Sequence, residues 1–236
     1  MEIKGFQKVT LIDYPGKIAC TLFLSGCNFA CGFCHNPELV VPLLQDAKSY
    51  SQNEVIEYLK NRKNLLDAVC ISGGEPMISL DKDFLKSIKE LGYLIKIDTN
   101  GTFPERLKDL IDKNLVDFIA MDIKAKKENY ESVANSKIDL KKIEESMKII
   151  SSEMKNYEFR TTIIEGVHDI EEMKEIAEWL NNITGIKPKK FCLQGFKNKG
   201  KLISDEFKSK KETEEKYLLE LKDAIKDYFE EVEIRV

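Results

Sequence analysis

The amino-acid sequence predicts an α/β protein built as an incomplete (β/α)6 barrel with an N-terminal hairpin. Short runs rich in apolar and β-branched residues alternate with longer amphipathic runs, six times along the 236 residues. The short runs lack strict polar–apolar alternation, which is typical of strands buried on both faces of a parallel sheet. No Gly-, Ser- or Pro-rich linker interrupts the pattern, so residues 1–236 are predicted to form a single domain.

The elements follow one another in a regular order. The hairpin comes first, around Asp13-Tyr14-Pro15-Gly16, and a short strand at residues 232–236 is expected to flank the barrel at its other end. Ser51 is expected to cap the first long helix and Pro104 to lie in the first turn of the third. The strands are predicted at residues 18–24, 68–72, 94–99, 116–123, 158–164 and 190–195. The helices are predicted at residues 52–60, 82–91, 104–113, 140–151, 170–181 and 211–229.

Composition places the chain among ordinary globular proteins. Hydrophobic residues make up 42% and charged residues 33% of the sequence, and the net charge of −4 gives no argument for a nucleic-acid partner. No apolar run approaches the roughly 18 residues that span a bilayer, and the first residues lack a secretory pattern. We therefore expect a cytoplasmic protein without nucleic-acid or membrane partners. The lysine clusters at 187–190, 197–201 and 208–211 are expected to be solvated loops.

Three cysteines after the first strand carry the strongest chemical signal. Cys27, Cys31 and Cys34 have the spacing C-x3-C-x2-C, which supplies three thiolates from one short loop. Cubane iron–sulfur clusters normally take four cysteines, and structural zinc takes four protein ligands. Three cysteines without an obvious fourth predict a cluster with one open iron, the position where chemistry occurs.

A zinc site is the alternative, with His35 as the fourth ligand. The neighbours Cys34 and His35 would then both have to turn toward one tetrahedral metal, which a short loop rarely allows. Six cysteines in a chain of this length, three of them clustered, indicate metal chemistry in a reducing compartment rather than a disulfide framework.

Several other residues are expected to be structural. Cys20, Cys70 and Cys192 lie inside apolar runs and are predicted to be packed thiols. Trp179 is expected in the core on one face of a helix. His168 precedes a helix and is expected in a surface loop, outside any functional site.

Polar motifs follow the predicted strands. Gly73-Gly74-Glu75-Pro76 comes after the second strand, and its glycines allow positive φ and close approach of a ligand. Asp98-Thr99-Asn100-Gly101 ends the third strand, and Asp122 and Lys124 end the fourth. The carboxyl ends of parallel barrel strands host active sites, so these groups are predicted to share one site. Arg160, which lies early in the fifth strand, is the exception.

The cysteine motif and the Gly-Gly-Glu-Pro turn together resemble the radical S-adenosylmethionine (SAM) superfamily. Four further runs narrow the resemblance to the glycyl-radical enzyme activating enzymes: Leu11-Ile12-Asp13-Tyr14-Pro15-Gly16-Lys17, Cys34-His35-Asn36-Pro37-Glu38, Asp98-Thr99-Asn100-Gly101 and Met121-Asp122-Ile123-Lys124. The stretch from residue 5 to residue 40 is especially similar to the activating proteins of anaerobic ribonucleoside-triphosphate reductase. The resemblance covers most of the chain.

The resemblance implies a set of cofactor contacts. One [4Fe–4S] cluster would be held by the three cysteines, with the amino and carboxylate groups of SAM on the fourth iron. Asp98 and Asp122 would together hold a monovalent cation. The implied SAM contacts are Phe33 near the adenine, Gly73, Gly74 and Glu75 at the methionine amine, Asp98 and Asn100 near the methionine and ribose, and Asp122, Lys124 and Arg160 around the carboxylate.

The resemblance also implies an activity, that of an oxidoreductase of the formate-C-acetyltransferase-activating type. The protein would cleave SAM reductively and abstract hydrogen from a glycine of a partner glycyl-radical enzyme, anaerobic ribonucleotide reductase. A flavodoxin or ferredoxin would supply the electron, because no second cysteine-rich segment is present. The Asp13 hairpin and residues 194–201 are predicted at the barrel mouth, where Tyr14 and Phe196 would clasp an extended peptide.

Two alternatives remain at this point. The chain could be a radical SAM enzyme that acts on a small molecule, like the 7-carboxy-7-deazaguanine synthases, which also have compact barrels. It could instead be a metal-stabilised binding module without catalysis, which would bind zinc and be colourless.

Overall fold

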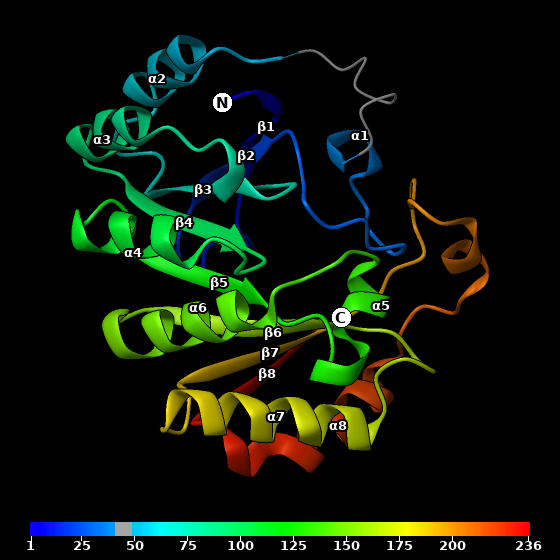
Figure 1. The fold of residues 1–236 in the computed structure, drawn as a ribbon. Helices are drawn as coiled ribbons and strands as arrows, with labels where there is room; N and C mark the ends of the chain where they lie inside the picture. The colour runs from blue at the N-terminus through cyan, green and yellow to red at the C-terminus, as the bar shows by residue number, and fades with distance from the viewer. Residues whose placement is uncertain (41–48) are drawn as a thin grey trace.

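The computed structural model describes residues 1–40 and 49–236. Its strands form one curved sheet with the order β1 to β8, in which β1 is antiparallel to β2 and every later pair is parallel (Figure 1). β1 and β8 are the two edges of the sheet, so the barrel is open between them and the predicted partial barrel is confirmed. The strands are β1 (Ile3–Thr10), β2 (Ala19–Leu24), β3 (Ala68–Gly73), β4 (Leu94–Thr99), β5 (Phe118–Asp122), β6 (Tyr157–Ile163), β7 (Lys190–Gly195) and β8 (Glu231–Arg235).

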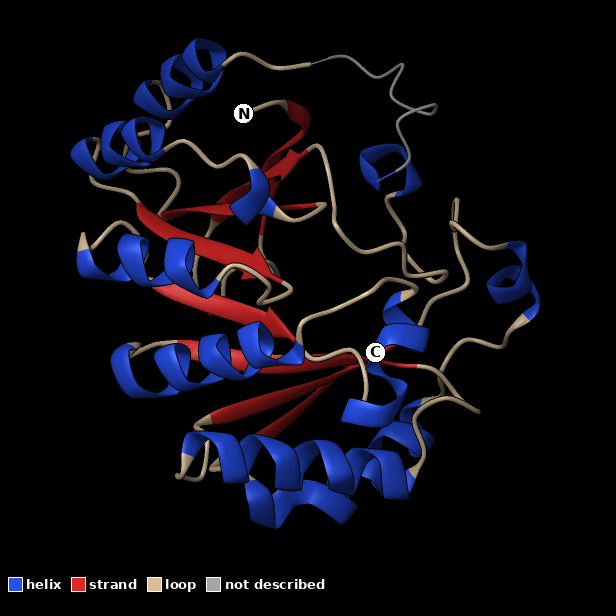
Figure 2. Cartoon of the chain, in the orientation of Figure 1, coloured by secondary structure: helices blue, strands red, loops and turns tan. Residues whose placement is uncertain are grey.

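The helices cover the outer face of the sheet (Figure 2). Ser51 caps α2 as predicted, because its hydroxyl accepts a hydrogen bond from the Glu54 backbone while Glu54 closes a capping box. The predicted helix at 211–229 is shorter, since a 3₁₀ turn follows Ile225. No helix among the described residues is long and apolar enough to cross a membrane. The helices are α1 (Pro37–Val40), α2 (Gln52–Lys60), α3 (Lys82–Glu90), α4 (Pro104–Asp112), α5 (Tyr130–Ala134), α6 (Leu140–Glu153), α7 (Ile170–Thr184) and α8 (Glu215–Ile225).

Apolar side chains fill both sides of the sheet, but unequally. The large core lies between the sheet and the helices, and Trp179 belongs to it, packed edge-on against Tyr130. A small second cluster forms around Ala68, Cys70 and Phe118. Cys70 is buried there, and Cys20 and Cys192 are buried too, so the three isolated cysteines are packed thiols as predicted.

The hairpin lies at the opposite end of the barrel from the cysteine motif. Thr10 pairs with Ala19 and Ile3 with Leu24, so the turn at residues 11–18 lies beside the amino end of β2. Tyr14 is buried there, with its ring centroid 5.6 Å from that of Phe118. Asp13 nevertheless lines one cavity with Gln194 and Lys197, so the role of the hairpin at the open barrel mouth stays a prediction.

Candidate functional site

A cavity of about 280 Å³ opens at the carboxyl ends of the parallel strands. Apart from Glu75, every residue that the sequence predicts for the site lines this cavity, together with Asn36, Thr162 and Gln194. The predicted residues in the lining are Cys27, Cys31, Phe33, Cys34, Gly73, Gly74, Asp98, Asn100, Asp122, Lys124 and Arg160. Elements far apart in sequence thus bring the separate motifs to one place.

The three cysteines come from the loop that follows β2. A turn closes the loop, since the Cys34 N–H donates to the Cys31 carbonyl at 3.0 Å, and the Phe29 N–H donates to Cys27 Sγ at 3.4 Å. Burial raises the pKa of all three thiols, that of Cys27 to about 12, while the positive charge of Lys124 acts in the opposite direction on each. Thiolates at this place therefore need a cationic partner, and three thiols lining one cavity fit an iron–sulfur cluster.

The zinc alternative needs the same cysteines and His35 around a single ion. His35 Nδ1 instead lies 3.3 Å from the Lys199 carbonyl, and its ring lies against Phe196 with 6.0 Å between ring centroids. Within residues 1–40 and 49–236, no three His, Cys, Asp or Glu side chains gather closely enough to hold one metal ion. A cluster of four irons is larger than one ion and holds its thiolates further apart.

Gly73 and Gly74 allow the cysteine loop to cross directly over the end of β3. Gly73 has φ +119°, and a Cβ atom there would lie 2.4 Å from the Leu24 nitrogen. A Cβ on Gly74 would lie 2.0 Å from the Gly26 carbonyl oxygen. The sequence argument assigned these glycines to close approach of a ligand. The structure shows that the closest approach is between two protein loops, one of which carries the cysteines.

Glu75 is turned away from the cavity and is 1% exposed. Its carboxylate accepts hydrogen bonds from the Asn100 N–H at 2.6 Å, the Thr99 hydroxyl at 2.9 Å and the Met77 N–H at 3.0 Å. Burial raises the pKa of Glu75 to about 7 against these donors. Glu75 therefore fixes the end of β4, and its contact with a methionine amine stays a prediction.

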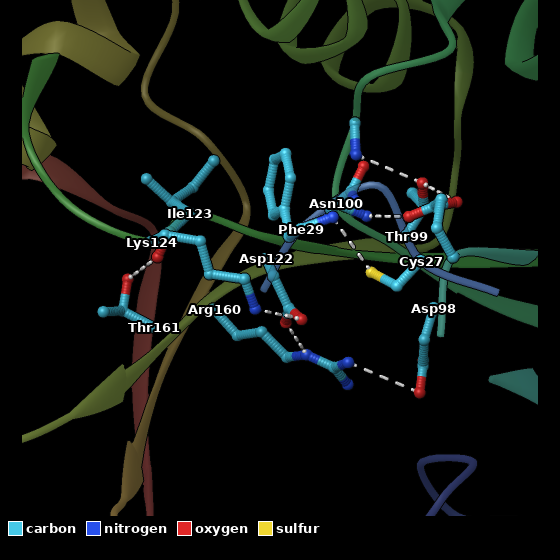
Figure 3. A network of polar contacts seen from close by, with 12 residues as sticks. Cys27, Phe29, Asp98, Thr99, Asn100, Asp122, Ile123, Lys124, Arg160 and Thr161 are labelled. Carbon is cyan, nitrogen blue, oxygen red and sulfur yellow. Dashed lines mark hydrogen bonds and ion pairs between the residues drawn. The ribbon is translucent and has the colours of Figure 1, made fainter. Parts of the chain in front are cut away.

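A partly buried cluster of charged side chains also lines the cavity (Figure 3). Arg160 pairs with Asp122 and, through Nη2 at 3.4 Å, with Asp98 Oδ2. Lys124 Nζ lies 2.9 Å from Asp122 Oδ2, and Lys96 pairs with Asp98. Three cations thus surround two carboxylates. The surplus positive charge suits a bound carboxylate, which forms strong charge-assisted hydrogen bonds with such groups.

Each charge in this cluster holds its neighbours ionised. Burial alone would raise the pKa of Asp98 and Asp122, but Arg160 beside both, Lys96 and Lys124 keep those pKa values below the usual range. Against desolvation, Asp122 correspondingly raises the pKa of Lys124, and Asp122 and Asp98 together raise that of Arg160. A monovalent cation at Asp98 and Asp122 stays a prediction, and in the structure the Arg160 guanidinium pairs with both carboxylates.

Asn28 ties the cysteine loop to the loop after β4, a role that sequence reasoning missed. Its Oδ1 accepts from Asn100 Nδ2 at 2.9 Å, and its Nδ2 donates to the Thr102 hydroxyl oxygen at 2.9 Å. The signal was present in the sequence, because Asn28 is a polar residue directly after Cys27. Its partners, more than seventy residues away, were not predictable from local pattern.

His168 is fully buried, so its predicted place in a surface loop is wrong. Its Nδ1 accepts from the Ile164 N–H at 3.1 Å, which leaves Nε2–H to donate to the Lys124 carbonyl at 2.9 Å. Burial lowers the pKa of His168 to about 4, so the ring is neutral at neutral pH. The sequence around it reads as a polar turn, whereas its function is to fix the backbone that carries Lys124.

Comparisons with known proteins agree with this arrangement. The model of the radical SAM superfamily matches residues 21–180. A Methanocaldococcus jannaschii protein, named among the glycyl-radical enzyme activating enzymes, is 32% identical over 241 residues, covering 99% of this chain and 95% of that protein. The pyruvate formate-lyase-activating enzyme of Clostridium pasteurianum is 30% identical over 129 residues, 52% of each chain. A solved domain of the Bacteroides vulgatus pyruvate-formate lyase-activating enzyme has a TM-score of 0.58 at 19% identity, covering 72% of this chain and 99% of that one, and shows the same fold.

The fold, the cysteine loop and the family match define one class of protein: this chain belongs to the radical SAM superfamily. Within that superfamily, it is homologous to proteins named as activating enzymes of glycyl-radical enzymes. The family implies a [4Fe–4S] cluster and SAM as cofactors, and the donor set of the cavity fits both.

Proposed function

We propose that this protein activates a glycyl-radical enzyme, with anaerobic ribonucleotide reductase as its partner. One observation carries the proposal: the C-x3-C-x2-C cysteines and the cationic cluster around Asp122 line the same cavity. That combination provides thiolates for a cluster beside positive charges for a ligand carboxylate. The full-length relative named as an activating enzyme supports the reaction class.

Cys27, Cys31 and Cys34 are the proposed cluster ligands. When bound, the cluster supplies the single electron that splits a sulfonium C–S bond of SAM into methionine and a 5′-deoxyadenosyl radical. Lys124 is the proposed partner of the methionine carboxylate, because its ammonium lines the cavity and is held in place by Asp122. Arg160 contributes a second positive charge to the same cavity lining.

The remaining SAM contacts are proposed from their place in the lining. Gly73 and Gly74 offer backbone groups for the methionine amine, and Asp98 and Asn100 lie in the lining beside the proposed place of the methionine and the ribose. Phe33 offers an aromatic face for the adenine. These groups come from three different strand ends, which lets the barrel hold the sulfonium in one orientation and exclude water.

A protein substrate is favoured by a second cavity on the open side of the barrel. This cavity has a volume of about 350 Å³ and is lined by Asp13 and Arg235 among other residues. It shares Asp98, Arg160 and Gln194 with the cysteine cavity, so the two spaces lie on either side of the same residues. An extended glycine-containing segment could therefore enter beside SAM from the open side.

The experiment combines two measurements on the anaerobically reconstituted protein. We expect 5′-deoxyadenosine to form from SAM with a strong reductant, and a glycyl-radical doublet to appear in the electron paramagnetic resonance spectrum of added anaerobic ribonucleotide reductase. The matched control is Cys31→Ala, which should give neither product. Cleavage of SAM without a doublet in any glycyl-radical enzyme would contradict the proposal and favour a small-molecule substrate.

A further inference from the structure

We propose that residues 197–211, here called the lysine cap, form the docking surface for an acidic one-electron donor protein. This inference rests on the proposed function, because reductive cleavage of SAM requires an external electron. The cap follows β7 and lies beside the cysteine loop and α5, on the right in Figure 1. It combines contact with the cysteine loop and a concentration of positive charge.

The lysine cap packs directly on the part of the loop between the second and third cysteines. The Ser204 N–H donates to the Gly32 carbonyl at 2.9 Å, and the ring of Phe207 lies against Phe33 with 5.8 Å between centroids. A Cβ atom on Gly32 would lie 2.6 Å from the Phe207 ring, so any other residue here would displace that ring. The cap therefore touches the backbone that joins two proposed cluster ligands.

The charge of the cap is opposite to that of the whole protein. Six lysines and two carboxylates lie in residues 197–211, while the chain carries a net charge of −4. Lys208 pairs with Asp205 at 2.5 Å and Lys197 with Glu212 at 3.7 Å. Of the other four lysines, Lys210 lies over the Phe207 ring, 5.6 Å from its centroid. The other three are exposed: Lys199, Lys201 and Lys211. These lysine clusters are solvated, and their position beside the cysteine loop gives them a further use.

A third cavity reaches the cysteine loop from the side of the cap. It has a volume of about 510 Å³ and is lined by Gly32, Phe33, α5, the loop after β6 and the cap residues Ser204, Glu206 and Phe207. Only Phe33 is shared with the cavity of the cysteines. A donor protein bound at this cavity would contact the cysteine loop from the side of the lysine cap. SAM and a peptide would occupy the cavity of the cysteines on the opposite side of the loop.

The observations favour an electron donor over the glycyl-radical enzyme at this surface. The enzyme must deliver a glycine to the cavity that SAM occupies, and the open side of the barrel leads there. A donor delivers only an electron: it is oxidised by one electron, the cluster is reduced by one, and no atom moves. Attraction between opposite charges speeds the association of a donor protein with its acceptor, and this attraction weakens as the salt concentration rises.

The test compares two charge-reversal variants of the reconstituted holoenzyme. The cap variant carries Lys199→Glu, Lys201→Glu and Lys211→Glu, and the control carries Lys141→Glu, Lys142→Glu and Lys148→Glu on the exposed face of α6. The probe is an acidic flavodoxin, whose affinity is measured by calorimetry at low and high salt. We expect about tenfold or greater loss of affinity in the cap variant, with little salt dependence left, and near wild-type binding in the control.

SAM cleavage driven by titanium(III) citrate separates this inference from the proposed function. The cap variant should cleave SAM normally with this small reductant, whereas failure of the wild-type protein to do so would contradict the proposed function alone. Equal flavodoxin affinity in cap variant and wild type, or equal loss in the control, would overturn the docking surface. Loss of affinity for the glycyl-radical enzyme but not for flavodoxin would overturn it too. A second variant with glutamine at the three cap positions removes the charge if the glutamates disturb folding.

Discussion

Arg160 lies level with Asp122 in the parallel pairing of β5 and β6, and its guanidinium pairs with that carboxylate. Asp122 is the last residue of β5, whereas Arg160 lies in the middle of β6. The stagger between these strands therefore brings a mid-strand arginine to the site. The sequence placed Arg160 away from the strand ends because a single strand does not reveal its register with its neighbour.

Asp122→Ala should weaken SAM binding about tenfold or more while leaving the iron content unchanged. The carboxylate positions both Lys124 and Arg160, and its removal leaves two cations without their shared partner. The free energy of unfolding should also fall by about 3–5 kcal/mol. Equilibrium dialysis with SAM and iron analysis check the two parts. Asp109→Ala, which removes an exposed carboxylate on α4, is the control, and equal SAM affinity in both variants would make Asp122 purely structural.

Gly74→Ala should disturb the cysteine loop. Its added methyl group would meet the Gly26 carbonyl oxygen, and neither backbone segment can move without the other. We expect a loss of about 1–3 kcal/mol in unfolding free energy and reduced iron content after reconstitution. Gly92→Ala is the control, because Gly92 has a positive φ, unlike Gly74, and a Cβ atom there would face open space. Both variants should lose stability, but a normal iron content is expected only for Gly92→Ala.

His168→Gln should change how stability depends on pH. Burial lowers the pKa of His168 to about 4, so below its ordinary value of 6.5 the unfolded chain binds a proton that the folded chain does not. The neutral ring therefore makes its full contribution to the free energy of unfolding above pH 6.5, and this contribution is lost as pH falls toward 4. The loss is on the order of 3 kcal/mol and should be absent in the variant, whose amide keeps a donor near the Lys124 carbonyl.

Urea unfolding of both proteins between pH 4 and 7 measures this difference. The difference in unfolding free energy between the wild-type protein and the variant should shrink steadily as pH falls. A constant difference at every pH would mean that His168 is not held neutral in the folded protein.

Cys31→Ala should remove most of the iron bound after anaerobic reconstitution, since it deletes one of three ligands from a single loop. Cys70→Ala provides the control, because Cys70 is equally buried but lies in the small apolar cluster inside the barrel. Iron content and the brown colour of the protein are the readouts. Full cluster retention in Cys31→Ala would show that the motif is not the cluster site.

The sequence was sufficient to predict the order of the strands and the motifs at their ends. Runs such as Ala68–Gly73 and Leu94–Thr99 are apolar enough to be recognised locally, and the cysteine spacing is itself a chemical pattern. Each of these signals lies within a few neighbouring residues. The cysteine spacing and the motifs at the strand ends carry the family resemblance, and the residues that this resemblance implies, apart from Glu75, line the cavity.

Contacts between distant segments were the features that the local sequence did not reveal. His168 looked like a turn residue, yet its partner is the carbonyl of Lys124. The hydrogen bonds of the Glu75 carboxylate to Asn100 and Thr99 of the neighbouring strand end were likewise not predictable from the local sequence. The place of the hairpin turn beside the amino end of β2 follows from antiparallel pairing, which the local sequence does not reveal. Register and side-chain direction come from packing, which local sequence does not contain.

Hydrogen transfer from glycine tests the central claim most directly. Anaerobic ribonucleotide reductase is produced with glycine deuterated at Cα and is incubated with the reconstituted protein, SAM and a strong reductant. The deuterium content of the 5′-deoxyadenosine is then measured by mass spectrometry. An activase should transfer one deuterium into 5′-deoxyadenosine in step with the growth of the glycyl-radical signal. Abundant 5′-deoxyadenosine that carries no deuterium, with no radical on the reductase, would contradict this account.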